Sequence, residues 1–163
     1  MKRLKRVASF ETPSEFLSAW CNDHLSVDVE SIQKIANENQ DCIYSGEAFR
    51  YIELNVDYED KEQSELIEES RMNINSIIES SSFSSSQRGV TYFITTDYRE
   101  FGVIIKSSVR GLDIKALANK YRDEITHSHI FEYTNMEDEI VTLEEVSNFE
   151  VAALVIEEEI EWL

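Results

Sequence analysis

The segment Phe101–Val109, with the sequence FGVIIKSSV, decides the fold class. Its aromatic and β-branched residues are typical of a β-strand, and the apolar run Gly102-Val103-Ile104-Ile105 predicts burial on both faces of a sheet. A second run of the same kind, VAALVI, occupies residues 151–156. The two runs predict strands that are covered on both sides.

Segments of similar composition around this one are predicted as further strands. They are Cys42–Leu54, Val90–Thr95, Glu139–Leu143 and Phe149–Ile156. Helices are predicted from the start signal Thr12-Pro13-Ser14-Glu15 to about Asp23, and over Asp28–Asn37, Asp60–Arg71 and Asp113–Asp123. Because helices come first and a mostly strand-built half follows with one crossover helix, the sequence predicts an α+β fold.

The length of 163 residues predicts a single domain, with helices over 1–40 and a strand-rich core over 41–163. One proline and four glycines leave no flexible linker, and no apolar run reaches the roughly 20 residues that a membrane span needs. Cys21 and Cys42 are expected to be buried or half-buried thiols, with no metal site at either. We therefore expect a cytoplasmic protein without a secretory signal.

The acidic composition bears on possible partners. The chain has 33 acidic and 15 basic residues, and its formal net charge is -18. Such a charge repels phosphate backbones and attracts basic proteins, so direct nucleic-acid binding is not expected. It also supports one alternative function, a non-enzymatic inhibitor that imitates the charge of DNA.

Two polar clusters are candidates for chemistry: Ser84-Ser85-Ser86, within the segment Ser82–Ser86, and Glu137-Asp138-Glu139, which precedes Ile140-Val141. On a strand, Glu137 and Glu139 would point the same way, about 6–7 Å apart, and could address one substrate together. A carboxylate beside a ribose stabilises the positive charge that develops when a glycosidic bond breaks. The alternatives are a solvated acidic segment and a polar turn.

The serine cluster precedes the glutamate cluster in the chain, and in this order and spacing the stretch from about Cys42 to Ile156 resembles the arginine-type, toxin-like mono-ADP-ribosyltransferases. These include enzymes carried by bacteriophages. Ser82–Ser86 with Phe93 resembles their serine motif, and Glu137–Val141 resembles their catalytic strand. Val103-Ile104-Ile105 resembles the strand that connects these two motifs in the family, and Gly111-Leu112-Asp113-Ile114 resembles the turn that follows it. The resemblance implies a split β-sandwich with an N-terminal helical part. It also implies NAD as co-substrate, a protein acceptor with arginine as the expected residue, and the host cytoplasm as the location of a phage-encoded protein.

The resemblance also implies residue roles. Glu139 would bind the nicotinamide ribose and stabilise the cation, and Glu137 would position or deprotonate the acceptor. Ser84 would hydrogen-bond the catalytic acid and form the cofactor pocket with Ser85 and Ser86. Tyr133 would recognise the target protein or pack as an aromatic residue.

This chain differs from the family at the arginine that the family carries on its first strand. Where members often carry Tyr-Arg-Gly, this chain reads Tyr44-Ser45-Gly46, so Gly46 is retained and serine replaces arginine. In a shifted register Arg50 would contact the NAD phosphates, helped by Arg88 or Lys106. Otherwise the chain would be a catalytically degenerate binding module.

One expectation concerns stability rather than catalysis. The Glu139→Ala change should remove chemistry and leave folding nearly intact, because a surface-accessible acid contributes little to stability.

Overall fold

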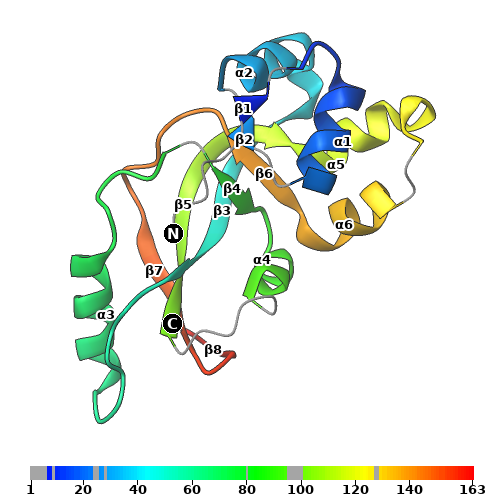
Figure 1. The fold of residues 1–163 in the computed structure, drawn as a ribbon. Helices are drawn as coiled ribbons and strands as arrows, with labels where there is room; N and C mark the ends of the chain where they lie inside the picture. Colours follow the sequence, from blue (N-terminus) through cyan, green and yellow to red (C-terminus); the bar gives the residue numbers. More distant parts are fainter. Residues whose placement is uncertain are drawn as a thin grey trace.

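The computed structural model describes residues 7–8, 10–23, 26–27, 29–79, 81–94, 101–126 and 129–163. For 7–8, 21–23 and 26–27 it describes only the backbone path. Strands β3, β5 and β7 run through the middle of the molecule, with helices at one end and on the flanks (Figure 1).

Strand β5 (Phe101–Asp113) organises the main sheet, which is antiparallel throughout. One edge of β5 pairs with β3 (Ile43–Glu53) along the whole length of β3. The other edge pairs first with β7 (Glu150–Ile156) and then with β6 (Glu139–Thr142). Strand β4 (Ser82–Ser84) pairs with both β6 and β3, so β3, β4, β6 and β5 form a closed ring of strands.

Two minor elements complete the strands. Strand β8 (Glu159–Trp162) pairs with the outer edge of β7. Strands β1 (Val7–Ala8) and β2 (Ser26–Val27) form a separate short parallel pair.

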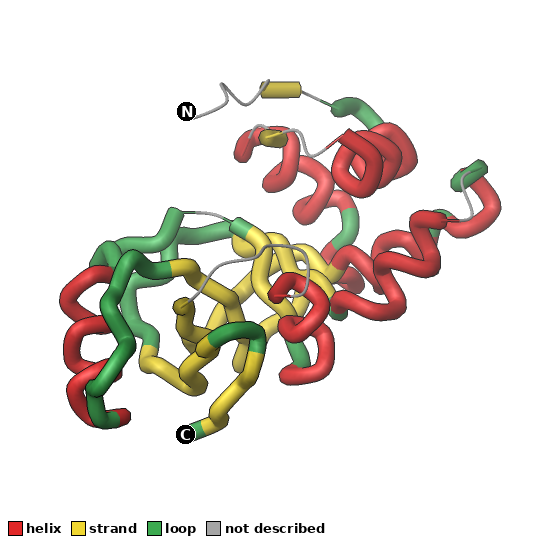
Figure 2. Tube along the Cα trace, turned by 60° about the horizontal axis from the view of Figure 1, so that its bottom comes forward, coloured by secondary structure: helices red, strands yellow, loops and turns green. Residues whose placement is uncertain are grey.

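Helices α1 (Pro13–Asp23), α2 (Val29–Glu38), α5 (Ile114–Lys120) and α6 (His129–Glu137) gather at one end of the sheet (Figure 2). The Thr12 hydroxyl accepts a hydrogen bond from the Glu15 amide at 3.2 Å, as expected where a hydroxyl caps a helix that begins with proline. Apolar residues of all four helices bury one another in a shared core with β6. Its fully covered members include Phe16, Leu17, Leu117 and Ile130.

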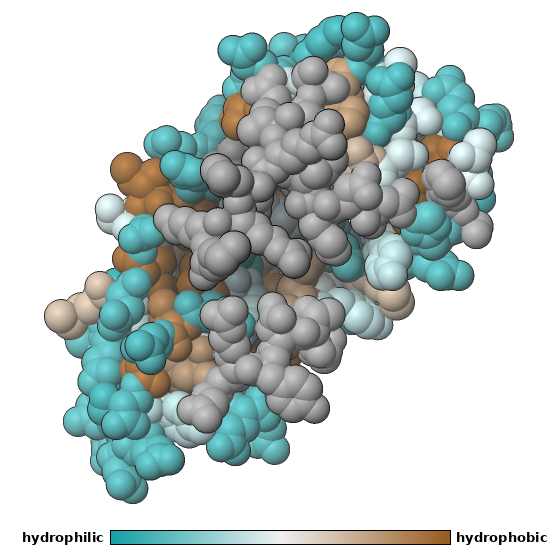
Figure 3. All heavy atoms as spheres, viewed as in Figure 1, coloured by the Kyte–Doolittle hydropathy of each residue, from teal (hydrophilic) through white to brown (hydrophobic). Residues whose placement is uncertain are grey.

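The remaining two helices lie apart from this group. Helix α4 (Gln87–Ile94) covers one face of the sheet, where Val90 and Ile94 pack with Ile104 and Ala153. Helix α3 (Gln63–Asn73) flanks β7 at the end away from α1 and α2, and hydrophilic side chains cover its outer surface (Figures 1 and 3). Two short 3₁₀ helices, η1 (Gln40–Cys42) and η2 (Arg122–Glu124), follow α2 and α5.

The structure confirms the α+β class and most predicted elements. Strands β3, β5, β6 and β7 and helices α1, α2, α3 and α5 lie within a few residues of their predicted ranges. Val103, Ile104 and Ile105 are completely buried, as the apolar run predicted, and Cys42 is a buried free thiol. The side chain of Cys21 lies outside the described residues. Within the described part of the chain, no helix has the length and apolar character of a membrane span.

The strand predicted over Val90–Thr95 is wrong, because residues 87–94 form helix α4 and Thr95 lies outside the described residues. The Ser86 hydroxyl accepts a hydrogen bond from the Gly89 amide at 2.9 Å and caps the helix. Val90 and Ile94 are one helical turn apart and both face the sheet. The helix cap and the helical spacing of the apolar residues therefore outweigh the strand-like composition of this segment. Helix α6 and strand β8 were not predicted.

Candidate functional site

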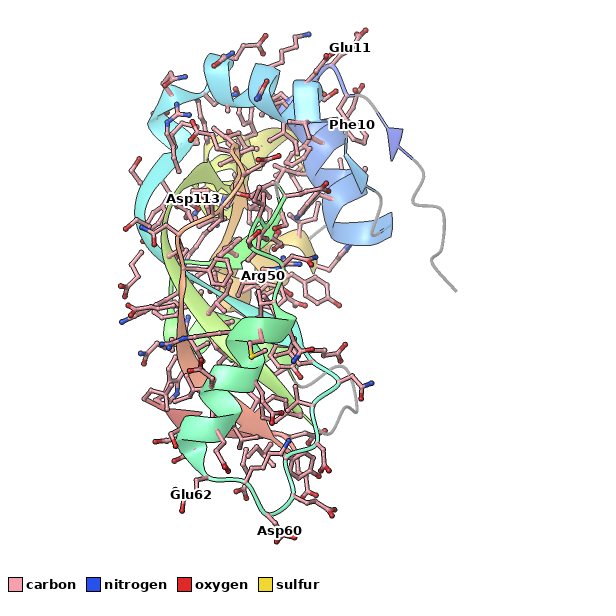
Figure 4. All side chains as sticks on the ribbon, turned by 90° about the vertical axis from the view of Figure 1, so that its left-hand side faces the viewer. Phe10, Glu11, Arg50, Asp60, Glu62 and Asp113 are labelled. Atoms are coloured by element: carbon pink, nitrogen blue, oxygen red, sulfur yellow. The ribbon has the colours of Figure 1, made fainter. Side chains whose placement is uncertain are left out.

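Arg50 lies on β3 in the middle of the molecule, between the α1 end, where Phe10 is labelled, and the loop that carries Asp60 and Glu62 (Figure 4). Its guanidinium donates a hydrogen bond to the backbone carbonyl of Ser82 at 2.6 Å and stands 5.9 Å from the centre of the Phe83 ring. Burial lowers the pKa of Arg50 from its ordinary value, although a guanidinium stays charged at neutral pH. Neither contact neutralises that charge.

A cleft of about 390 Å³ opens beside Arg50. Strands β3 and β4 and helix α4 form its walls. The residues that line it are Phe49, Arg50, Tyr51, Ile52, Glu53, Ser82, Phe83 and Phe93. The lining combines aromatic side chains and hydroxyls with one guanidinium, from Arg50, and one carboxylate, from Glu53. Within it, the Arg50 guanidinium is the group that can bind an anionic part of an organic ligand.

Ser82 connects Arg50 to the first residue of β6. The hydroxyl of Ser82 donates to Oε2 of Glu139 at 2.5 Å. The indole Nε1–H of Trp20, on α1, donates to the other carboxylate oxygen, Oε1. Arg50, Ser82, Glu139 and Trp20 therefore form one continuous chain of contacts across β3, β4, β6 and α1.

Glu139 is 7% exposed, so the expectation that it is a surface-accessible acid is wrong. Its alanine variant would leave the Trp20 and Ser82 donors without an acceptor, and a buried donor without a partner costs about 1–3 kcal/mol. A glutamine variant keeps the shape and an acceptor oxygen. Glu139→Gln is therefore the variant that tests the charge of this carboxylate.

Glu137 does not share a strand with Glu139, which corrects the predicted i, i+2 geometry. It is the last residue of α6, Asp138 adopts a left-handed backbone conformation with φ of 46°, and β6 begins only at Glu139. Aspartate tolerates this conformation better than most residues. The two glutamates are therefore neighbours across a corner between helix and strand.

Ser84, Ser85 and Ser86 form hydrogen bonds to this corner and not to the Glu139 carboxylate, which corrects the role predicted for Ser84. The Ser84 hydroxyl donates to the backbone carbonyl of Glu137 at 2.7 Å. The Ser85 amide donates to the carbonyl of Asp138 at 2.9 Å, and the Ser86 hydroxyl donates to the Asp138 carboxylate at 2.6 Å. Ser82, two residues earlier, makes the contact that was predicted for Ser84.

Other predicted residues lie away from the cleft. Gly46 lies four residues before Arg50 on β3, next to the Tyr44 ring, and does not line the cleft. Arg88 donates to the backbone of Asn135, and Lys106 pairs with Glu150 at 3.2 Å. Neither joins Arg50.

Tyr133 lies on α6, one helical turn before Glu137, and is 48% exposed. Residues four apart share a helix face, so the phenol and the Glu137 carboxyl face the same side. This placement keeps Tyr133 available to an approaching protein.

The Glu137 carboxyl has a strongly raised pKa. Burial, with a further contribution from the negative charge of Glu139, raises the pKa of the Glu137 carboxyl to about 7. A carboxyl with this pKa exchanges its proton near neutral pH, which suits an acid–base role.

The raised pKa of Glu137 predicts a pH-dependent stability. The folded protein holds this proton up to about pH 7 and the unfolded chain loses it near its ordinary value of 4.5, so this group makes the free energy of unfolding fall as the pH rises between these values. The Glu137→Gln variant should gain about 1–2 kcal/mol relative to wild type between pH 5 and pH 8, after discounting for partial exposure. Urea unfolding at several pH values measures this, with Glu132→Gln on the same helix as control. Parallel stability profiles for wild type and Glu137→Gln would contradict it.

Sequence reasoning missed Trp20 as a site residue. Trp20 lies in the first predicted helix, and no local pattern links it to Glu139, 119 positions away. Ser82 could have been found, because it begins the quoted serine segment. Among the described residues, no group of His, Cys, Asp and Glu side chains is arranged to hold a metal ion.

Comparisons with known proteins do not identify the chain. No family model, curated protein or solved structure matches it.

Proposed function

We propose that this protein cleaves NAD at its nicotinamide glycosidic bond and transfers the ADP-ribose to a protein side chain. The observation that carries the proposal is the chain of contacts from the Arg50 guanidinium through Ser82 to the Glu139 carboxylate, beside a cleft of about 390 Å³. A cation for phosphate, a hydroxyl and a buried carboxylate are the groups that this reaction requires. They come from three strands and meet at one place.

The reaction assigns a different role to each glutamate. The bond between ribose C1′ and the nicotinamide nitrogen breaks, its electron pair leaves with nicotinamide, and Glu139 stabilises the positive charge on the ribose. A nucleophilic nitrogen of the acceptor then bonds to C1′ and gives its proton to the ionised Glu137 carboxylate. The Glu137 pKa of about 7 leaves a substantial ionised fraction at neutral pH.

The proposal extends to the fold and to the acceptor. The closed ring of β3, β4, β6 and β5, with helices at one end, supports the split β-sandwich of the family that the sequence resembles. The net charge of -18 supports a basic acceptor protein, because opposite charge accelerates encounter. Arginine is the acceptor side chain that the resemblance implies.

Arg50 should determine NAD affinity. In the Arg50→Lys variant one ammonium cannot both keep the Ser82 carbonyl contact and bind two phosphate oxygens in a fork, so the dissociation constant for NAD should rise about tenfold or more. Isothermal titration calorimetry measures this. Arg71→Lys, an exposed change in the last turn of α3, is the matched control and should bind NAD as wild type does.

The transfer itself is tested with NAD labelled in the adenylate part and two acceptor peptides of equal charge, one rich in arginine and one rich in lysine. We expect label on the arginine peptide and release of nicotinamide. If the protein binds neither NAD nor its fragments but binds basic proteins with steep salt dependence, the acidic-inhibitor function replaces the enzyme. If it binds NAD without cleaving it, a degenerate binding module replaces the enzyme.

A further inference from the structure

Trp20 contacts the site, and the proposed reaction assigns it no role. It lies in the second half of α1, and its indole Nε1–H donates to Oε1 of Glu139. The second oxygen, Oε2, accepts from Ser82 at 2.5 Å. Both oxygens of the catalytic carboxylate are therefore bound by side chains of the same chain.

A ligand in the cleft cannot contact Glu139 in this arrangement. Arg50 and Ser82 line the cleft, whereas Glu139 does not, and Glu139 is 7% exposed. Because the carboxylate is almost fully covered, a side chain that covers it must move before a ribose hydroxyl can reach it.

The two donors differ in how firmly they are held. Ser82 belongs to β4, whose backbone pairs with β6 at Val141 and contacts the Arg50 guanidinium. Trp20 is only half-buried, and its ring stacks on Phe16 with 5.7 Å between ring centres. Trp20 is therefore the donor that can move with less loss of structure.

From these contacts we infer that the Trp20 indole is an intramolecular plug, which occupies the ribose-binding position of Glu139 and is displaced when NAD enters. The inference rests on the proposed function and adds a closed resting state to it. The helix itself stays in place, because Phe16 and Leu17 are completely buried in the helical core. The motion is a rotation of one side chain.

A plug lowers the apparent affinity for NAD by the fraction of molecules that are open. Trp20→Phe keeps an aromatic ring on Phe16 but removes the N–H donor and part of the bulk. We expect this variant to bind a non-hydrolysable carbocyclic analogue of NAD about tenfold more tightly than wild type, the size expected from releasing one hydrogen bond to a charged group.

A second measurement follows the indole directly. The protein contains two tryptophans, so ¹⁵N-labelled indole gives two N–H signals, and Trp162→Phe assigns the one from Trp20. In the free protein this proton should exchange slowly with water. The Glu139→Gln change and the NAD analogue should each shift the signal, and the analogue should also speed its exchange. This arm uses wild-type protein and remains informative if Trp20→Phe fails to fold.

The outcomes separate the plug from the proposed function. Tighter binding by Trp20→Phe and release of the indole by the analogue support the plug. Equal binding by both proteins with an unchanged indole signal overturns the plug and leaves the transferase function standing. A lower kcat for Trp20→Phe with an unchanged dissociation constant also overturns it, because Trp20 would then position Glu139. If neither protein binds the analogue, the plug and the proposed function are both wrong.

Discussion

Replacing Glu139 by glutamine is expected to lower the rate of NAD cleavage about 10²–10³-fold, the loss typical when one electrostatic contact to a transition state is removed. The amide keeps the volume of the carboxylate but carries no negative charge to oppose the charge on the ribose. It can still accept the hydrogen bond from the Trp20 indole. We therefore expect a folded protein with nearly unchanged NAD affinity and a much lower kcat.

Release of nicotinamide from labelled NAD measures this loss, and thermal unfolding checks the fold. Glu68→Gln, an exposed change on α3, is the control for the loss of one negative charge and should cleave NAD at the wild-type rate. Equal cleavage by wild type and Glu139→Gln would remove Glu139 from the reaction. A low rate in Glu139→Gln accompanied by a lower unfolding temperature would point to misfolding instead.

The Gly89→Ala variant should be strongly destabilised and should also lose activity. A β-carbon at position 89 would lie 2.2 Å from the Ser84 hydroxyl oxygen and 2.3 Å from the Glu137 carbonyl oxygen, which are the two atoms of one hydrogen bond. Neither can withdraw, because Ser84 belongs to β4 and the carbonyl belongs to the backbone. Helix α4 must separate from the α6–β6 corner, and overpacking of this kind costs about 1–3 kcal/mol.

Urea unfolding of the Gly89→Ala variant measures the cost, and the pH profile of NAD cleavage reports whether Glu137 has moved. Gly46→Ala is a matched control. There the added carbon would lie 2.9 Å from the hydroxyl oxygen at the far end of the Tyr44 side chain, which can shift. We expect a loss below about 1 kcal/mol for Gly46→Ala. Similar losses in the two variants would show that the contact between Gly89, Ser84 and Glu137 does not organise the corner.

The parts of the fold that were predicted are those with a strong local pattern. The apolar run 102–105 forces burial on both faces, and the Thr12-Pro13 start signal fixes the beginning of α1. Helix α4 was missed because Val90, Tyr92 and Phe93 favour strands in isolation, whereas the Ser86 cap and the packing of Val90 on the sheet favour a helix.

The site was predicted in outline and not in its contacts. Arg50, the serine segment and Glu139 do lie together, because β3, β4 and β6 are neighbours in the sheet. The partner of Glu139 was assigned to Ser84 instead of Ser82, and Glu137 was placed on a strand. Both errors concern the direction of side chains near the junction of α6 and β6. The left-handed backbone conformation of Asp138 sets that direction, and the residue types give no clear signal of it.

The β3–β5 ladder has a consequence for when the contacts around Glu139 form during synthesis of the chain. Ser82 and Glu139 are 57 residues apart and Arg50 and Ser82 are 32 apart, while β3 and β5 join partners about fifty to seventy residues apart. Pairing over such separations requires closure of long loops and slows folding. A nascent chain therefore cannot join Arg50 and Ser82 to Glu139 until β6 has been synthesised and has paired with β4.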